Sequence, residues 1–543
     1  MSLAKITKIL ENKLSSTDSA LIGRAYNFLN KEISLLITPD KKIISEYAKQ
    51  LAELAAQKNA SADFIIAGLF APLAKEKPEL TRVIEKNFSK SVEIICHSML
   101  FAMKKLEPDN KDVFMHSFRT AARLSNIKVG TAPICAALLH ELTVHTQTTL
   151  EMIKKEFSGE ISELIEKFLR IRVIKTSNNS QYSSHLREMI VAMAADLRVI
   201  IIKMCSNIDR LEIYGAKYTP TKLAEIASES MELLSPLADL LGIWDLRWQL
   251  EDHAFRILQP EEYRKILLRF NLEERKNREK YIQKAKNVLE KELKEADIKA
   301  QITGRFKHFY SIYSKMLKQK KSFNEICDVF ALRVIVGTID DCYRVLGIIH
   351  RLWKPKVRRI KDYIATPKNN GYQSLHTTVF GMNGHPTEFQ IRTQEMDDID
   401  NFGIAAHWYY KNPRKKTPEW VQELLSKQKK VSNDEDFINQ FSTELLQHRI
   451  YVYSPKGDVI SLPQDSTPVD FAYKIHTEVG NKCAGAIVND NKVPLNIKLN
   501  SSDVVEIILD RTQPGPRPEW LTFVKAPETK KQINDFLNKR LVE

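Results

Sequence analysis

The sequence contains no apolar run long enough to cross a membrane. The longest, FIIAGLFAPLA from Phe64, falls well short of the roughly 20 residues that a spanning helix needs. The N-terminus has no signal-peptide pattern, so we expect a cytoplasmic protein without a membrane partner. The six cysteines form no CxxC pair, which excludes a zinc knuckle and a disulfide framework and predicts reduced core thiols.

The chain is long and basic. At 543 residues it is expected to hold roughly three or four domains. The formal net charge of +14 predicts polyanionic partners, either nucleotides or RNA, although charge alone does not distinguish between them.

Pattern shifts along the chain predict a multidomain protein with α and mixed α/β parts. Apolar residues at spacings of three and four, with few glycines, predict an all-α domain over 1–272. A charge-laced helix over 273–299 suits a connector, and β-branched runs that alternate with helical stretches predict a mixed α/β domain over 300–415. Beyond it we expect a helical linker over 416–446, a small β-rich module over 447–510 and a tail with one basic helix over 511–543.

The run TEFQIRT alternates polar and apolar residues. On a strand, Glu388, Gln390 and Arg392 would share one face while Phe389 and Ile391 take the other. A carboxylate and a guanidinium would then point together into a cleft. The alternative is the solvated outer face of an edge strand.

A second basic group lies in GRFKHFYSIYSKM. A helix that begins after Gly304 would put Arg305, His308, Ser311 and Lys315 on one side, where they could grip a polyphosphate. The alternative is a solvated basic face. The other side of this helix would face the core with Phe309, Ile312, Tyr313 and Met316.

An acid and a tight turn complete the central group. Asp328 opens the apolar strand DVFALRVIV, where a carboxylate needs a metal or a partner, and a strand-end cap or a pair with Arg333 is the alternative. The Asn-Asn-Gly turn at 369–371 lets the backbone approach a ligand, and an aromatic beside it can stack on a base. The residues around that turn are Lys361, Lys368, Tyr372 and His376. Together these groups predict two nucleotides and a divalent metal.

The motifs GRFKHFYSI, RIKDYIATPKNNGYQSLHTT, EFQIRT and AAHWYYK resemble the synthetase domain of the long RelA/SpoT homologue family. That family transfers pyrophosphate from ATP to the ribose 3′-oxygen of GDP or GTP in the stringent response. The resemblance therefore implies a nucleotidyltransferase-like fold for 300–415, the substrates ATP, GDP and GTP, and Mg²⁺ as the metal.

The resemblance also implies a role for individual residues. Asp328 and Glu388 would hold Mg²⁺ and act in catalysis, with Glu388 drawing the 3′-hydroxyl toward attack, and Tyr372 would stack on guanine. The donor phosphates would be held by Arg305, Lys307, His308 and Lys315, and the acceptor by Lys361, Lys368, Asn370 and His376. Further nucleotide-binding residues would be Ser311, Arg359, Gln373, Gln390 and Arg392. The sequence at 359–362 is similar to the RxKD variant of bifunctional members.

The N-terminal half is similar to the family's HD hydrolase domain, but it departs from it at the metal site. In the family, a His-Asp pair and a Glu-Asp pair hold Mn²⁺ and activate water. This chain has His140-Glu141 at the first pair and Val144-His145 at the second, which removes both water-activating acids.

One further metal ligand is changed in the same domain. Ser206 stands where the family has an Asp, Arg210 stands where it has an Asn, and His116 remains at the first His ligand. Asp209 could replace the missing Asp only with a shift of helix register. We therefore expect no hydrolysis, no Mn²⁺ and a regulatory role for this domain. The remnant consists of His116, His140, Glu141 and His145, which either bind a metal or are buried structural residues.

Residues 447–510 resemble a TGS domain, which implies a small β-grasp-like fold. The matching segments are VYSPKGDVISLP and STPVDFAYKIHTEVG. The resemblance implies uncharged tRNA and the ribosome as partners, with His476 contacting tRNA, whereas a core or turn histidine is the alternative. Residues 511–543 resemble the start of the family's helical region.

Two other functions compete with a synthetase that carries an inactive HD domain. One is an Mn²⁺-dependent hydrolase of guanosine tetraphosphate, or a bifunctional enzyme. The other is a catalytically silent sensor of tRNA or the ribosome.

Overall fold

The computed structural model describes most of the chain as two compact units, one before residue 404 and one from residue 449 onward. The described residues are 3–9, 15–36, 40–172, 189, 196–213, 217–269, 272–319, 330–356, 359–367, 372–381, 384, 386–403, 449–455, 459–500, 503–510, 512 and 514–542. Among them, no helix combines the length and the hydropathy that crossing a bilayer requires. The five described cysteines are buried and unbridged, as predicted.

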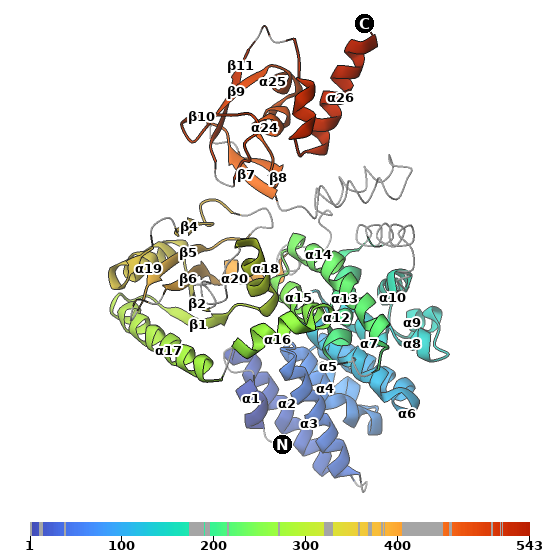
Figure 1. Ribbon diagram of the computed structural model, residues 1–543. Helices are drawn as coiled ribbons and strands as arrows, with labels where there is room; N and C mark the ends of the chain where they lie inside the picture. Colours follow the sequence, from blue (N-terminus) through green and yellow to red (C-terminus); the bar gives the residue numbers. More distant parts are fainter. Residues whose placement is uncertain are drawn as a thin grey trace. The chain divides into compact units, whose positions relative to one another are not determined.

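The first unit begins with an array of helices, as the sequence predicts (Figure 1). They are α1 Leu3–Ile9, α2 Ser16–Ser34, α3 Lys41–Gln57, α4 Ala62–Glu76, α5 Leu80–Asn87, α6 Lys90–Asn126, α7 Thr131–Leu139, α8 Leu142–His145, α9 Leu150–Glu156, α10 Gly159–Arg172, α12 Leu197–Glu212, α13 Pro220–Glu229, a π-helical turn Ser230–Leu234, α14 Ser235–Leu240, α15 Trp244–Leu258 and α16 Pro260–Arg269. Hydroxyl caps start several of them, as where Ser61 accepts from the Phe64 N–H and Ser89 from the Val92 N–H.

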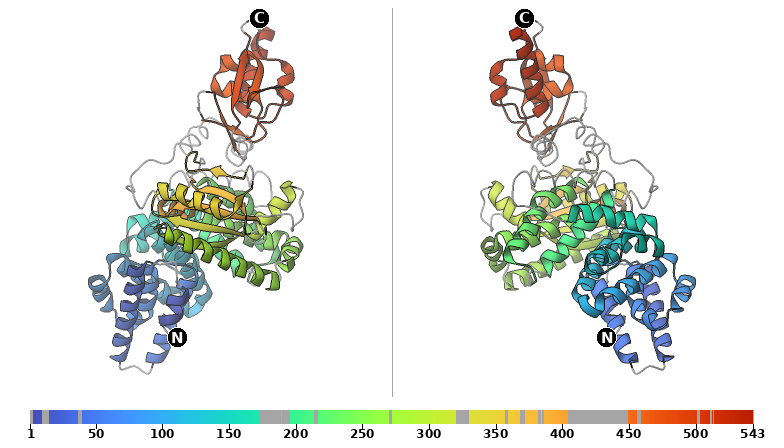
Figure 2. Two further views of the ribbon diagram at one scale, coloured as in Figure 1. Left: turned by 90° about the vertical axis from the view of Figure 1, so that its left-hand side faces the viewer. Right: turned by 90° about the vertical axis from the view of Figure 1, so that its right-hand side faces the viewer.

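Two helices form the centre of this array. Helix α4 is apolar on all sides, so nearly every residue of it is buried, and α2, α3 and α6 pack around it. These N-terminal helices form the blue group at the foot of both views in Figure 2. Helix α12 is also buried along almost its whole length, although it carries Ser206, Asp209 and Arg210. Buried charges need polar partners, so these residues of α12 belong to buried polar networks.

The same unit continues into a mixed sheet. Its strands are β1 Ala300–Phe306, β2 Phe330–Val336, β3 Lys354–Pro355, β4 Lys361–Asp362, β5 Leu375–Phe380 and β6 Pro386–Thr393, and its helices are α17 Leu272–Glu295, α18 Phe309–Gln319, α19 Ile339–Leu352 and α20 Gln394–Phe402. The strand order is β1-β2-β6-β5-β3, with β4 also paired to β5. Among the described strands of this sheet, β2 and β6 run parallel and the other pairs are antiparallel.

One face of the sheet is apolar and covered by α17 and α19. Phe389 and Ile391 point into this core, where Trp353 stacks on Phe389 with ring centroids 5.4 Å apart. Helix α17, which the sequence predicts as a connector, buries Leu289 and Leu293 in the same core. Helix α17 is therefore a layer of the mixed α/β domain as well as a link to it.

The second unit is small and β-rich, as predicted. It contains β7 Arg449–Tyr453, β8 Val459–Pro463, β9 Cys483–Val488, β10 Asn491–Val493 and β11 Val505–Leu509, with α24 Pro468–Ile475, α25 Thr477–Asn481, a 3-10 turn Pro518–Thr522 and α26 Pro527–Val542. Phe471 of α24 packs between the two small sheets. Trp520 and Ile533 pack against the other side of helix α24. The expected linker over 416–446 lies outside the described residues.

Candidate active site

Polar residues form a row across the second face of the sheet. In the strand register, Lys361 lies beside His376, His376 beside Gln390, and Gln390 beside Arg333. In the next row, Glu388 lies beside Ala331 and Thr378, and the backbone of Arg305 pairs with that of Ala331. Residues opposite one another on neighbouring strands share a face, so the predicted alternation of Glu388, Gln390 and Arg392 is confirmed.

Glu388 is the carboxylate at the centre of these rows. Its Oε1 lies 3.0 Å from Nδ1 of His376, and Nε2 of the same ring lies 2.6 Å from the Tyr372 hydroxyl. The Gln390 amide donates toward Glu388 at 3.5 Å. Because its side chain is 19 % exposed, Glu388 is fixed in direction and still open to a ligand.

Arg392 lies deeper than the sequence indicates. It is 0 % exposed and forms ion pairs with Asp397 and Asp400 of α20. The same guanidinium donates to the Tyr372 hydroxyl at 3.0 Å and to Gln390 at 3.1 Å. Arg392 therefore supports the site from below, which corrects the expectation that its guanidinium points into the cleft.

The acids of α20 also bind a second arginine. Arg333 lies 3.0 Å from Asp397 and 3.9 Å from Asp400. Sequence reasoning missed both carboxylates, although their spacing of three on a helix directly after β6 places them on one side. Asp328, the alternative partner of Arg333 in the sequence analysis, lies outside the described residues.

The donor candidates lie around the start of α18. The sequence predicts one helix from Gly304, but Arg305 is in strand β1 and α18 begins only at Phe309, so His308 lies between the two elements. Ser311 and Lys315 are on α18 and, like Lys307, are partly buried. The predicted apolar side of α18 is confirmed, and it packs on α15 and α16.

The acceptor candidates are described only in part. Arg359 and Lys361 are exposed, and Gln373 donates to the Ile364 carbonyl at 3.3 Å. Lys368 and Asn370 lie outside the described residues. In the second unit, His476 is exposed at the N-cap of α25, where its Nδ1 accepts from the Glu478 N–H at 3.2 Å.

The remnant residues of the helical half meet around Glu141. One Glu141 oxygen lies 3.2 Å from Arg210 and 3.2 Å from His140, and the other lies 2.8 Å from Arg172 and 3.3 Å from His145. Burial alone would raise the pKa of Glu141, but the charges of His140 and Arg210 outweigh it and hold that pKa below its usual value. Glu141 is thus an ionised carboxylate with two guanidinium groups against it.

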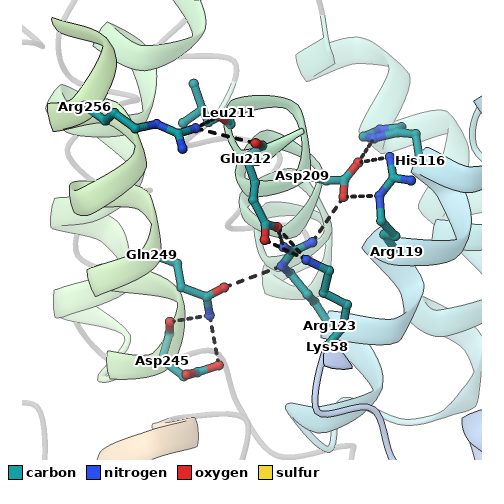
Figure 3. A network of polar contacts seen from close by, with 10 residues as sticks. All are labelled: Lys58, His116, Arg119, Arg123, Asp209, Leu211, Glu212, Asp245, Gln249 and Arg256. Atoms are coloured by element: carbon teal, nitrogen blue, oxygen red, sulfur yellow. Dashed lines mark hydrogen bonds and ion pairs between the residues drawn. The ribbon is translucent and has the colours of Figure 1, made fainter. Parts of the chain in front are cut away.

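His116 lies at the edge of a second buried network (Figure 3). Its Nδ1 lies 2.8 Å from Asp209 and its Nε2 lies 3.1 Å from Ser206. Asp209 also accepts from Arg119 and Arg123. Burial lowers the pKa of His116 to about 4, although Asp209 acts in the opposite direction, so the ring is neutral at pH 7.

The residues around Glu141 are the candidate ligands for a divalent cation in the described helical half. His116, His140 and Glu141 offer three ligand atoms that all lie within 4.8 Å of one another. However, both nitrogens of His116 already have partners, and Arg172 and Arg210 supply positive charge at Glu141 where a metal would supply it. The residues present therefore fit Mn²⁺ poorly. At Glu388, a partly exposed carboxylate is a hard oxygen donor of the kind that suits Mg²⁺.

Comparisons with protein families identify the class of each part. Residues 304–415 match the region found in RelA / SpoT proteins, residues 94–244 match an HD domain, and residues 450–509 match a TGS domain. The chain therefore combines a RelA/SpoT region with an HD and a TGS domain.

Curated relatives agree with this combination. The chain is 41% identical over 431 residues to a guanosine-3′,5′-bis(diphosphate) 3′-pyrophosphohydrolase of Aquifex aeolicus, covering 78% of this chain and 61% of that protein. It is 36% identical to a GTP pyrophosphokinase of Myxococcus xanthus, covering 83% and 61%, and 39% identical to the bifunctional (p)ppGpp synthase/hydrolase of Escherichia coli, covering 78% and 61%. The matches span about three fifths of the length of these relatives, which are named for synthesis, for hydrolysis or for both. The chain belongs to the RelA/SpoT family.

Proposed function

We propose that the protein transfers pyrophosphate from ATP to the ribose 3′-hydroxyl of GDP or GTP, forming guanosine tetraphosphate or pentaphosphate. The observation that supports this most is the Glu388–His376–Tyr372 chain on the polar face of the sheet, held from below by Arg392. Such a transfer needs oriented substrates and neutralised charge more than covalent catalysis, and this face supplies fixed donors and one directed carboxylate.

In this proposal Glu388 receives the proton of the 3′-hydroxyl. The 3′-oxygen forms a bond to the β-phosphorus of ATP, the bond between that phosphorus and the α–β bridging oxygen breaks, and AMP leaves. Glu388, together with Asp328, would hold Mg²⁺, which neutralises phosphate charge when bound. Because the Arg392 guanidinium lies over the Tyr372 ring, 5.1 Å from its centroid, guanine would stack on the opposite side of that ring.

We further propose that the HD domain does not hydrolyse the product. Two water-activating acids of the family pattern are replaced by Val144 and His145, and Arg172 and Arg210 engage Glu141. A bifunctional enzyme is the second candidate, because His116, His140 and Glu141 still offer three ligand atoms and relatives are named as hydrolases. We also propose that the TGS domain contacts uncharged tRNA or the ribosome through the exposed His476.

The test is nucleotide chromatography of the purified chain with labelled ATP, GDP or GTP and Mg²⁺, beside samples with guanosine tetraphosphate and Mn²⁺. We expect alarmone formation in the first set and no loss of guanosine tetraphosphate in the second. Loss in the second set would establish the bifunctional alternative. Absence of synthesis would contradict the proposal.

Glu388→Gln should abolish synthesis, because it removes the charge and keeps the shape. The expected loss is at least about 100-fold in kcat, the usual scale for removing a group that accepts a proton in the transition state. Gln283→Glu is a suitable control, since Gln283 is an exposed residue of α17 that bonds only locally to Asn287. A Glu388→Gln variant that keeps full activity would disprove the role assigned to Glu388.

A further inference from the structure

Helix α15 of the helical half reaches the donor side of the synthetase site. The His308 ring, a donor-phosphate candidate, stacks on Trp248 with centroids 4.1 Å apart and planes 6° apart. Trp244 lies against the same ring at 6.0 Å and 46°. Two tryptophans one helical turn apart therefore fix the plane of this imidazole.

The same helix also fixes the start of α18. The Asp252 carboxylate accepts from the N–H groups of Phe309 at 3.2 Å and Tyr310 at 2.9 Å. These are the first two helical N–H groups, so Asp252 serves as an N-cap supplied by another element. Burial raises the pKa of Asp252 to about 6, and the two backbone N–H donors act against that rise. The expected phosphate grip at this helix end must therefore come from side chains, because Asp252 occupies these two N–H groups.

Apolar packing stabilises the contact between α15 and α18. Ile312 of α18 is 0 % exposed and packs with Phe255 and Ile266, and the Tyr313 ring stacks on Phe255 at 4.8 Å. Burial of several large side chains stabilises an interface more than one capping carboxylate does. Release of α18 from α15 would expose all of them. The contact with α15 therefore supports α18 permanently. Separating the two helices would cost too much free energy for the contact to act as a switch.

We propose that Trp248 and Asp252 are positioning residues for the ATP side of the synthetase site. This inference rests on the function proposed above. Trp248 sets the ring plane of His308, and Asp252 sets where α18 begins. Together they place Lys307, Ser311 and Lys315 for the donor triphosphate. Among the described residues, neither Trp248 nor Asp252 forms a hydrogen bond or ring contact with the GDP side, which is built on β5, β6 and α20, although α15 itself packs against α20.

The test separates ATP from GDP in steady-state kinetics of the full chain. Asp252→Ala and Trp248→Leu should each raise KM for ATP by about tenfold, the effect of losing one cap or one ring contact. KM for GDP should stay within twofold. Asp252→Asn, which keeps an acceptor oxygen, and Trp248→Phe, which keeps a ring, should recover most of the loss. Thr338→Ala is the matched control, because it removes the N-cap of α19 in the same domain.

A binding measurement keeps this test independent of turnover. Calorimetric titration with the ATP analogue that has a methylene bridge between the α- and β-phosphates should show the same tenfold loss for Asp252→Ala and none for Thr338→Ala. Equal changes for ATP and GDP, no change for either, or faster synthesis by the variants would overturn the inference. If the wild-type chain binds the analogue but makes no alarmone, the proposed function fails while the positioning role stands.

Discussion

Arg392 illustrates how one residue can support a site that it does not reach. It is 0 % exposed, and its charge is shared between Asp397 and Asp400, while its second amino group holds Tyr372 and Gln390. A planar guanidinium can serve four partners in a fixed geometry, which an ammonium group cannot. The position of Tyr372 thus depends on an arginine buried below it.

Replacement of Arg392 should therefore affect stability as well as activity. Arg392→Gln leaves two nearly buried carboxylates with only Arg333 to neutralise them, and we expect a loss of about 3 kcal/mol in the free energy of unfolding. Urea denaturation measures it. Arg351→Gln, which breaks the largely exposed pair with Glu292, should cost less than about 1 kcal/mol. Equal losses for the two variants would contradict the buried-network account.

The depth of Arg392 could not be read from the sequence, although the face it occupies could. Alternation in TEFQIRT gives the side of the strand, but it does not tell which helix covers that side.

At the level of elements, the same limit explains the error at Arg305. Ile302, Gly304 and Phe306 alternate as in a strand, while the residues after them repeat as in a helix, and pairing of Arg305 with Ala331 decides the outcome.

Helix α15 contacts both the buried network around Asp209 and the start of α18. Arg256 donates to the Leu211 carbonyl at the end of α12, and Arg123 of α6 donates to Gln249 (Figure 3). On the same helix, Trp248 stacks on His308 and Asp252 caps the start of α18. The segment WDLRWQLEDHAF has the helical spacing of Leu246, Leu250 and Ala254, but that period does not tell which elements its polar and aromatic residues will meet.

His253 on α15 should make folding sensitive to acid. Burial, together with the positive charges of Arg256 and Arg123, lowers its pKa to about 3. The unfolded chain, with an ordinary His pKa near 6.5, therefore takes up a proton first as pH falls, so stability is lost below about pH 6.5. Between pH 7.5 and 5 this group alone should cost up to about 2 kcal/mol.

Urea unfolding of His253→Gln at both pH values measures that term. The variant cannot titrate at this position, so its stability should fall less than that of the wild type over the same range. His476→Gln is the control, because His476 is exposed in the other unit. An equal fall in all three proteins would mean that His253 titrates normally.

At the scale of the whole molecule, α15 joins the network around Asp209 to His308 and α18, which we propose for the ATP side. Glu212 accepts from Lys58 at 2.7 Å and pairs with Arg123, which also reaches Asp209 and Gln249. Because α15 contributes Gln249 and Arg256 to this network, a displacement of α15 that rearranges the network also moves Trp248 and Asp252. Coupling between two sites is reciprocal, so an ATP analogue that orders α18 should in turn order the network.

This linkage predicts the effect of Glu212→Gln, which removes a charge from the network and keeps its shape. Affinity for the methylene-bridged ATP analogue should fall by about fivefold, since coupling energies of this kind are on the order of 1 kcal/mol. Hydrogen exchange should reciprocally show stronger protection of α12 amides when the analogue is bound. Glu32 on α2 forms a comparable pair with Lys77, and Glu32→Gln, which breaks that pair, should change neither quantity. If Glu212→Gln leaves affinity and exchange unchanged, the network only supports the helical half, and regulation of the synthetase must act through another contact such as Lys128 with Asp398 of α20.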